Sequence, residues 1–444
     1  MKKWLPWLLL TLGVGIVFWN IRWIFVYKFE PEYWENYYYE SQWNVPNSKR
    51  GISDEGDYRY IGYRLVNGEN PFNVDYWVPP LGKYWYGVGS KYLGNPYLIS
   101  VTIYLLTLLV VGLLARILFE KQWQVWMAVY LFAFNPLIIE QISQTMLDLP
   151  MTLFWLVSLL FLYGKWPQNE RLRVIGAGIA LGLMAGTKPA FFVPMIALVS
   201  LGWIGWSNKK QWLYYLPSIV IGYLLAYSCY FIKHPNPIPF IRLHDKIIAF
   251  QKHNGGSHDW FNIFRVILTS KYQGFWVGGK SQWITTWSLL LPTGVLTALC
   301  VFVGWFKKIK IESVFVGIAI MSLAYIGMNL IIDFWPRYLV PLIPLFAFLV
   351  VRWWSKKPIL LLLLLVSYIP FIWLTLFPKD TAIKENFSYS LQNDFYRDSY
   401  RMLDSSTREH MNEQEWKTAS RILDLKRCKT VRELGQWRIN CQHL

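Results

Sequence analysis

The sequence predicts an all-α integral membrane protein with about 11 transmembrane helices. Of its 444 residues, 54% are hydrophobic and only 16% are charged, too few to cover the surface of a soluble domain of this length. The apolar residues come in blocks of roughly 17–22, the length that a helix needs to cross a bilayer. Within such blocks only a helix satisfies every backbone N–H and C=O group. Many of the 26 Trp and 28 Tyr residues lie beside the block ends, as in interfacial aromatic belts.

The predicted spans follow the apolar blocks in order along the chain. They are 4–26, 96–118, 124–142, 150–164, 173–187, 189–206, 212–232, 285–306, 312–332, 338–354 and 357–377. The first block resembles a signal peptide, because Met1-Lys2-Lys3 precedes the apolar stretch 4–19. It lacks a small-residue cleavage site, and Arg22-Trp23 is typical of an interface anchor. We therefore expect an uncleaved first helix.

The positions of Lys and Arg predict the orientation in the cell membrane. Short basic connections alternate with loops that are poor in positive charge or long: Lys2/Lys3, Arg116/Lys121, Lys165/Arg171/Arg173, Lys209/Lys210, Lys307/Lys308/Lys310 and Arg352/Lys356/Lys357. The positive-inside rule then predicts a cytoplasmic N-terminus, and an odd helix count predicts an extracytoplasmic C-terminus. These loops also account for much of the net charge of +17, so we expect no nucleic-acid partner.

Three long segments are predicted to face outward. The segment 27–95 is a large first outer loop carrying short helices, 233–284 is a second large outer loop, and 378–444 is a small C-terminal cap. Residues 1–377 would form the transmembrane module to which the two loops belong. In the cap, Cys428 and Cys441 are close in sequence and on the side where a disulfide is permitted, so either a bridge or two free thiols is possible. Cys229 and Cys300 lie in apolar spans and are expected to be packing residues.

The chemistry-bearing residues of the sequence gather in the predicted outer segments. There is no P-loop, GxGxxG, HExxH or CxxC motif, so cytosolic nucleotide chemistry has no support. The densest acidic cluster is Ser53-Asp54-Glu55-Gly56-Asp57-Tyr58. Taken alone, such a cluster is often no more than a solvated turn. After a spacer comes Val78-Pro79-Pro80-Leu81-Gly82-Lys83-Tyr84-Trp85, whose paired prolines and aromatic side chains suit a loop lying at the membrane interface.

This first segment resembles the first outer loop of the GT-C glycosyltransferases. The likeness rests on Asp54-Glu55 with Tyr58, Gly68, Asn70-Pro71, and Pro79-Pro80-Leu81 before Tyr84-Trp85. It is strongest to the protein O-mannosyltransferases and the lipid A aminoarabinose transferases, which use polyprenyl-phosphate sugars as donors. The resemblance implies a GT-C-like fold and an inverting transfer of a sugar to an acceptor hydroxyl on the extracytoplasmic side.

Four later features occur in the family's order, so that the resemblance covers residues 1–354. Asp148-Leu149-Pro150 is similar to the second acidic motif, and the 233–284 loop takes the place of the second large loop. Gly176, Gly178, Gly182 and Gly186-Thr187-Lys188-Pro189 resemble a small-residue helix that ends in an outer-facing Lys. Pro336-Arg337-Tyr338, followed by Pro341 and Pro344, is similar to the Arg-Tyr motif that opens a late helix.

The chemistry of sugar transfer suggests a role for each acid. The acceptor hydroxyl needs a base, and a carboxylate in a partly dry cleft can serve as one. Asp54 is the candidate for this general base. Glu55 is a second candidate, either structural or in contact with the acceptor. Asp148 is predicted to orient the acceptor, to pair with a cation, or to cap the helix that starts at residue 150.

The phosphate leaving group needs positive charge where the C1–O bond breaks. Lys188 and Arg337 are the candidates, with snorkelling at helix ends as the alternative interpretation. Lys83 is a further phosphate candidate, although the family has no Lys at that place. Tyr58 and Tyr338 belong to the matching motifs and are assigned to substrate binding.

A metal is possible but is not predicted to be required. Some relatives carry a Glu or His directly before the Pro-Pro-Leu stretch, where it helps to bind a divalent metal, whereas this chain has Val78, which cannot ligate. His244, His253 and His258 could supply imidazoles, but scattered His residues are more often surface residues.

Two alternatives to the transferase remain. An O-antigen ligase or polymerase would also be polytopic with a large outer loop, but its chemistry relies on Arg and His in that loop. A polyprenyl-lipid transporter or flippase would carry charges in the middle of its spans, often with inverted repeats. The expected partners are a polyprenyl-phosphate sugar, membrane lipid, and an acceptor that is a protein, lipid or glycan.

Overall fold

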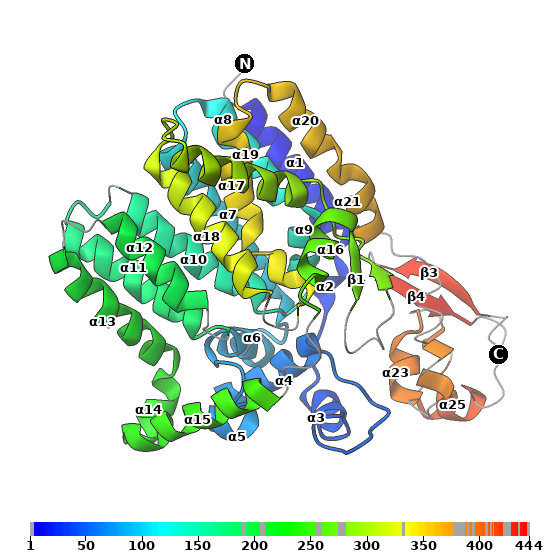
Figure 1. Ribbon diagram of the computed structural model, residues 1–444. Coiled ribbons are helices and arrows are strands. Elements are labelled where there is room, and N and C mark those ends of the chain that lie inside the picture. The colour runs from blue at the N-terminus through cyan, green and yellow to red at the C-terminus, as the bar shows by residue number, and fades with distance from the viewer. Residues whose placement is uncertain are drawn as a thin grey trace. The chain divides into compact units, whose positions relative to one another are not determined.

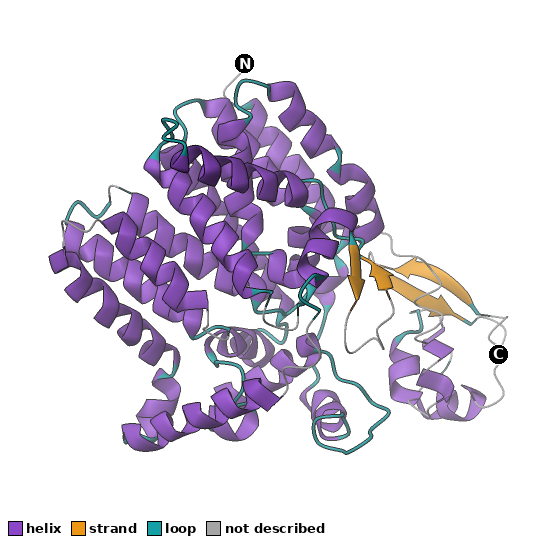
Figure 2. Cartoon of the chain, viewed as in Figure 1, coloured by secondary structure: helices purple, strands orange, loops and turns teal. Residues whose placement is uncertain are grey.

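The computed structural model describes most of the chain. The described residues are 4–164, 166–188, 192–204, 209–253, 259–273, 281–330, 334–376, 387–388, 390–392, 396–404, 407–408, 411, 413–420, 428–433 and 436–441. Helices dominate these residues, with two short antiparallel two-stranded sheets beside them (Figures 1 and 2). The helical fold class predicted from the apolar blocks is therefore confirmed for the described residues.

The chain divides into two compact units. The larger one comprises Lys28–Tyr38 and Ile52–Ile372, and the smaller one comprises Met1–Tyr27, Tyr39–Gly51 and Trp373–Leu444. The division of the chain into a 1–377 module and a 378–444 cap stays a prediction.

The larger unit contains most of the helices. In its first part these are α3 (Pro31–Tyr39), α4 (Asp54–Val66), α5 (Pro71–Val74), α6 (Leu81–Tyr92), α7 (Tyr97–Leu118), α8 (Gln122–Ala133), α9 (Pro136–Ile142), α10 (Asp148–Tyr163), α11 (Glu170–Ala185), α12 (Phe192–Ile204) and α13 (Lys209–Ala226). The rest are α14 (Ser228–Lys233), α15 (Pro237–His253), α16 (Asn262–Thr269), β1 (Lys271–Gln273), β2 (Ser281–Trp283), α17 (Leu290–Phe306), α18 (Ser313–Met328), the 3₁₀ helix η3 (Pro336–Leu339), α19 (Leu342–Trp353), α20 (Pro358–Val366) and α21 (Tyr368–Leu376).

Two helical stretches among the described residues are long and apolar enough to cross a membrane. They are Tyr97–Leu118 and Pro358–Leu376, and the bent pair α8 and α9 makes a third if it counts as one span. The bend between α8 and α9 is 58°. It lies at Asn135-Pro136, where Pro136 starts α9 and the Asn135 side chain accepts a hydrogen bond from the Leu137 N–H. Shorter apolar helices occupy several other predicted spans, and the number of about 11 spans stays a prediction.

Close helix packing builds the core of the larger unit. All the residues of α19 from Leu342 to Val351 are buried, as expected of a helix that is apolar all round. The helices α11 and α13 lie side by side (Figure 1), with Gly182 and Gly222 at their contact. A Cβ on Gly182 would lie 2.1 Å from the Ile219 carbonyl oxygen, so the two backbones can approach this closely only without side chains there.

Segment 27–95 contains short helices, as expected of the large first loop. It holds α3, α4, α5 and α6. Asn70 caps α5 by accepting a hydrogen bond from the Phe72 N–H at 3.0 Å. The helices α4 and α6 pack directly on one another.

The smaller unit contains both ends of the chain. Its elements are α1 (Leu5–Asn20), α2 (Trp23–Val26), α23 (Tyr396–Arg401), α25 (Glu413–Ala419), β3 (Lys429–Glu433) and β4 (Gln436–Asn440). Arg50 ties the 39–51 segment to the tail of the same unit, with ion pairs to Glu40 at 2.7 Å and to Asp398 at 2.9 Å.

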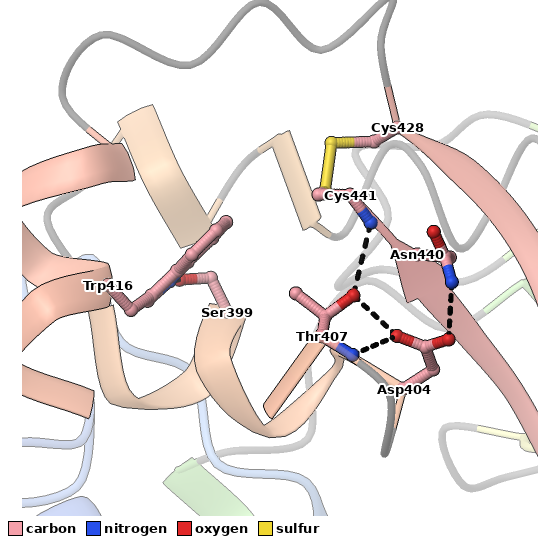
Figure 3. Close-up of a disulfide and its surroundings, with 7 residues drawn as sticks. All are labelled: Ser399, Asp404, Thr407, Trp416, Cys428, Asn440 and Cys441. Atoms are coloured by element: carbon pink, nitrogen blue, oxygen red, sulfur yellow. Dashed lines mark hydrogen bonds between the residues drawn. A yellow bond between two sulfur atoms is a disulfide. The ribbon is translucent and has the colours of Figure 1, made fainter. Parts of the chain in front are cut away.

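A disulfide joins Cys428 and Cys441 in the tail, so of the two possibilities left by the sequence the bridge is the one present (Figure 3). Beside it, Asp404 accepts hydrogen bonds from Thr407 and Asn440, and the Thr407 hydroxyl accepts one from the Cys441 N–H. Together with the buried Trp416, the bridge forms the core of the tail.

Candidate active site

The start of α4 presents Asp54 at the surface of the larger unit. Ser53 is the N-cap, and its hydroxyl accepts a hydrogen bond from the Gly56 N–H at 3.4 Å. Asp54 is thus the first residue of the helix, where the helix dipole favours a negative charge. Its side chain is 39% exposed, so a substrate can reach the carboxylate.

Arg337 pairs with Asp54, although the two residues are far apart in the sequence of the larger unit. It lies in η3, which begins at Pro336, and its guanidinium forms an ion pair and hydrogen bond with the Asp54 carboxylate. Its Nε lies 3.6 Å from Oδ2 of Asp148. One guanidinium therefore bridges the two acidic motifs that the sequence singled out.

Asp148 and Lys188 complete the cluster. The Asp148 side chain is 1% exposed, and its Oδ1 accepts a hydrogen bond from the Lys188 ammonium. Lys188 follows the end of α11, and its Nζ lies 3.9 Å from the centroid of the Tyr338 ring, within range of a cation–π contact. Asp54, Arg337, Asp148, Lys188 and Tyr338 thus form one connected set, which we call the Asp54–Lys188 cluster.

The contacts of this cluster bear on the alternatives left open by the sequence. The N-cap of α10 is Leu147, without a side-chain cap, while the Asp148 carboxylate contacts two cations. The helix-capping interpretation of Asp148 is thus not supported. Lys188 and Arg337 are largely buried and paired with acids, which does not fit snorkelling into solvent.

Burial and neighbouring charges act oppositely on the two cations. Burial lowers the pKa of Lys188 to about 8, and the nearby Asp148 carboxylate offsets this only in part. Burial also works against the charge on Arg337, but Asp54, Tyr338 and Asp148 outweigh it and raise the pKa of Arg337 above its ordinary value. Arg337 is therefore a permanent cation, whereas the Lys188 charge can be lost at mildly alkaline pH.

Tyr58 lies one helical turn after Asp54 and is buried. Burial raises the pKa of Tyr58 well above its ordinary value, and the charge on Asp54 adds to this effect. Its hydroxyl therefore stays neutral beside the cluster and is able to donate a hydrogen bond. Its assignment to substrate binding remains a prediction.

Glu55 points into a different network from Asp54. Its carboxylate lies 3.2 Å from the Arg59 guanidinium and accepts a hydrogen bond from the Tyr97 hydroxyl at 2.8 Å. Its backbone oxygen accepts one from Thr145 at 2.7 Å. These contacts favour the structural role among those considered for Glu55.

Lys83 is separated from solvent. It is fully buried, and its ammonium donates hydrogen bonds to Asp75 Oδ2 at 2.7 Å and to the Val78 carbonyl at 2.6 Å. The structure gives no support to a phosphate-binding role for Lys83.

Asp75 and Glu140 were not found from the sequence. Asp75 is the partner of Lys83, and no motif pointed to it. Glu140 lies in α9 and is close enough to Arg337 and Glu55 to interact with their charges. An acid inside an apolar block was the signal that could have drawn attention to it.

The proposed metal ligands are only partly described. In segment 233–284, the His244 ring is hydrogen-bonded to the Phe240 carbonyl and to the Tyr223 hydroxyl, each at 2.8 Å. The side chain of His253 and the whole of His258 lie outside the described residues. Within the described ranges, no three His, Cys, Asp or Glu side chains gather as metal ligands would. The expectation that no metal is required therefore stays a prediction.

Comparisons with known proteins agree with the resemblance seen in the sequence. Residues 79–232 match a family model described as dolichyl-phosphate-mannose-protein mannosyltransferase. This range includes Asp148 and Lys188, whereas Asp54 and Arg337 lie outside it. No curated protein is a match to this chain.

Two solved structures of ArnT from Cupriavidus metallidurans are similar to the chain. The apo form has 14% sequence identity and a TM-score of 0.46, over 77% of this chain and 60% of that one. The form bound to undecaprenyl phosphate has 15% identity and a TM-score of 0.49, over 83% of this chain and 64% of that one. The chain thus spans about three fifths of the length of these proteins. From the family match and the order of its motifs, the chain resembles the GT-C superfamily of glycosyltransferases, and in particular their polyprenyl-phosphate-sugar-dependent members.

Proposed function

We propose that this protein is a membrane glycosyltransferase that moves a sugar from a polyprenyl-phosphate donor to an acceptor hydroxyl on the extracytoplasmic side, with inversion at the anomeric carbon. The observation that carries the proposal is the Asp54–Lys188 cluster. It holds an exposed carboxylate and two largely buried cations within contact of one another. The family match over residues 79–232 and the ArnT structure bound to undecaprenyl phosphate support the choice of a polyprenyl phosphate.

The two cations are placed to hold the donor phosphate. A phosphate between Lys188 and Arg337 would receive charge-assisted hydrogen bonds from both. As the bond from C1 of the sugar to the phosphate oxygen breaks, its electron pair stays on that oxygen, and the cations stabilise the charge. Asp148 contacts both cations, which holds the ammonium and the guanidinium near one another.

Asp54 is the proposed general base. The acceptor oxygen attacks C1 from the face opposite the phosphate, and the Asp54 carboxylate takes the hydroxyl proton. In the structure the Arg337 guanidinium forms an ion pair with this carboxylate. A bound phosphate competes for Arg337, so arrival of the donor frees Asp54 to accept the proton. Base activation is in this way linked to occupancy of the phosphate site.

The test is a turnover assay with the protein in lipid nanodiscs. A panel of polyprenyl-phosphate sugars is supplied together with candidate protein, lipid and glycan acceptors, and loss of lipid-linked sugar is measured. One donor should be consumed, and Asp54→Asn should lower its turnover by about 10²–10⁴-fold, the usual worth of a general base. The control is Glu69→Gln, which breaks an exposed ion pair with Arg64 in the same outer segment and should leave turnover unchanged. Full activity of Asp54→Asn would remove Asp54 from the mechanism, and movement of the lipid without its consumption would favour a flippase.

A further inference from the structure

A second group of buried ionisable residues lies next to the candidate base. It consists of Asp57 in α4, Asp75 at the end of α5, and Lys83 in α6, which are 4%, 2% and 0% exposed. We call it the Lys83 triad. The helices α4 and α6, which carry Asp57 and Lys83, are in close contact: a Cβ on Gly62 would lie 2.2 Å from the Lys83 carbonyl oxygen. The backbones can meet at this point only because Gly62 lacks a side chain.

The Lys83 ammonium is buried and is held in place by three hydrogen bonds. An ammonium has three hydrogen-bond donors. They are directed to Asp75 Oδ2 at 2.7 Å, the Val78 carbonyl at 2.6 Å and the Asp75 carbonyl at 3.3 Å. The ammonium has no further donor for Asp57.

The charges of the triad do not balance if both acids are ionised. Two carboxylates then face one ammonium, and one negative charge is left without a partner in a dry interior, which is strongly unfavourable. One oxygen of each acid, Oδ1 of Asp57 and Oδ1 of Asp75, is buried without a hydrogen-bond partner within the described part of the chain. One bound proton between the two acids removes the excess charge.

The neighbours of each acid act in the same direction. Burial raises the pKa of Asp57 well above its ordinary value, the charges of Asp75 and Asp54 raise it further, and only Lys83 opposes them. Burial also raises the pKa of Asp75, while the ammonium and hydrogen bond of Lys83 lower it. Tyr227, the N-cap residue of α14, is close enough to Asp75 to interact with its charge. Asp57 is therefore the acid that keeps the proton.

We propose that Asp57 stays protonated beside the Lys83–Asp75 pair at neutral pH and is a positioning residue for the phosphate site. Because its side chain is neutral, it places no second negative charge next to Asp54. Asp57 lies three residues after Asp54, on the same face of α4. An ionised Asp57 would add its charge to that of Asp54 at the entrance for the donor phosphate, and this repulsion would weaken donor binding. The consequence for binding rests on the function proposed above, whereas the protonation itself does not.

The protonation is tested by infrared difference spectroscopy on the intact, ligand-free protein at pH 7. The spectrum of Asp57→Asn is subtracted from that of the wild type, so that other buried acids cancel. The carbonyl stretch of a protonated carboxylic acid should be present in the wild type and lost in Asp57→Asn. It should persist in the control Asp259→Asn, which changes a partly exposed acid in the second outer loop. A difference spectrum that shows loss of a carboxylate instead overturns the proposal.

The positioning role is tested by undecaprenyl phosphate binding at pH 7. Asp57→Asn copies the protonated acid, so its affinity should stay within about twofold of the wild type. In Asp75→Asn, Asp57 has to ionise to pair with Lys83, so the acid band should disappear and the affinity should fall about fivefold. Tighter binding by Asp57→Asn, or undiminished binding by a folded Asp75→Asn that has lost the band, overturns the role. Absence of any binding by the wild type would instead count against the proposed function, while the infrared result would still decide the protonation.

Discussion

The guanidinium of Arg337 pairs with the carboxylate of Asp54, although 283 residues separate them in sequence. The same side chain approaches Asp148, and Asp148 in turn pairs with Lys188. The candidate base is thus paired with the cation that, under the proposed function, also binds the donor phosphate. This arrangement makes Asp54 an internal competitor of the phosphate.

Asp54→Asn is therefore expected to bind undecaprenyl phosphate more tightly than the wild type. Removing the competing charge frees Arg337, and for a partly exposed ion pair the gain should be about fivefold, or about 1 kcal/mol. Fluorescence or calorimetric titration of the protein in nanodiscs measures it. Glu69→Gln removes a negative charge from the same outer segment without touching Arg337 and should leave the affinity unchanged. Equal or weaker binding by Asp54→Asn would show that Arg337 does not exchange partners.

Asp148→Asn is expected to destabilise the protein more than any exposed charge substitution. It leaves the largely buried Lys188 without its carboxylate, and breaking one partner of such a pair costs about 3–5 kcal/mol. The reason is an unpaired ammonium, so the double variant Asp148→Asn/Lys188→Met should recover part of the lost stability. Thermal unfolding of the two variants checks this. A double variant that is less stable than the single one would contradict the explanation.

Binding of undecaprenyl phosphate is expected to weaken as the pH rises through about 8. Burial lowers the pKa of Lys188 to about 8, so its ammonium is present below that pH and is lost above it. A phosphate monoester has its second pKa near about 6, so above pH 7 it is mainly a dianion, and a loss of affinity through pH 8 comes from the cation. Lys188→Arg keeps a positive charge over the whole range. Its affinity should not fall between pH 7 and 9.5, and a wild-type affinity that is equally flat would rule out Lys188 as a phosphate ligand.

Loss of the Cys428–Cys441 bridge is expected to destabilise the tail. The two residues are 13 apart in sequence, and closing a loop of this size contributes about 3 kcal/mol by restricting the unfolded chain. Reductant, or the pair Cys428→Ser and Cys441→Ser, should bring an early unfolding step in calorimetry. Thiol labelling without reductant should modify neither Cys428 nor Cys441. Labelling of both tail cysteines in the untreated protein would mean that the bridge is absent.

The sequence predicted some residues of the candidate site correctly and others not. Asp54 stands in a motif of segment 27–95, while Asp148, Lys188 and Arg337 each stand in a motif at the end of an apolar block, and the structure brings all four together. Lys83 stands in a motif too, yet its side chain is buried against Asp75. The sequence shows where a residue lies along the chain, but the direction of a side chain at a helix start depends on what packs there.

The sequence by itself determined that the protein is helical and which stretches are apolar, because the length and hydrophobicity of a block are local properties. It also determined which charged residues stand in the motifs of segment 27–95 and at block ends, and so which were candidates for the site. Only the tertiary structure decided which acid meets which cation. The α4–α6 contact at Gly62 buries Lys83 with Asp75, and η3 carries Arg337 to Asp54. Pairing depends on distances between residues that are remote in the chain, and such distances are set by packing.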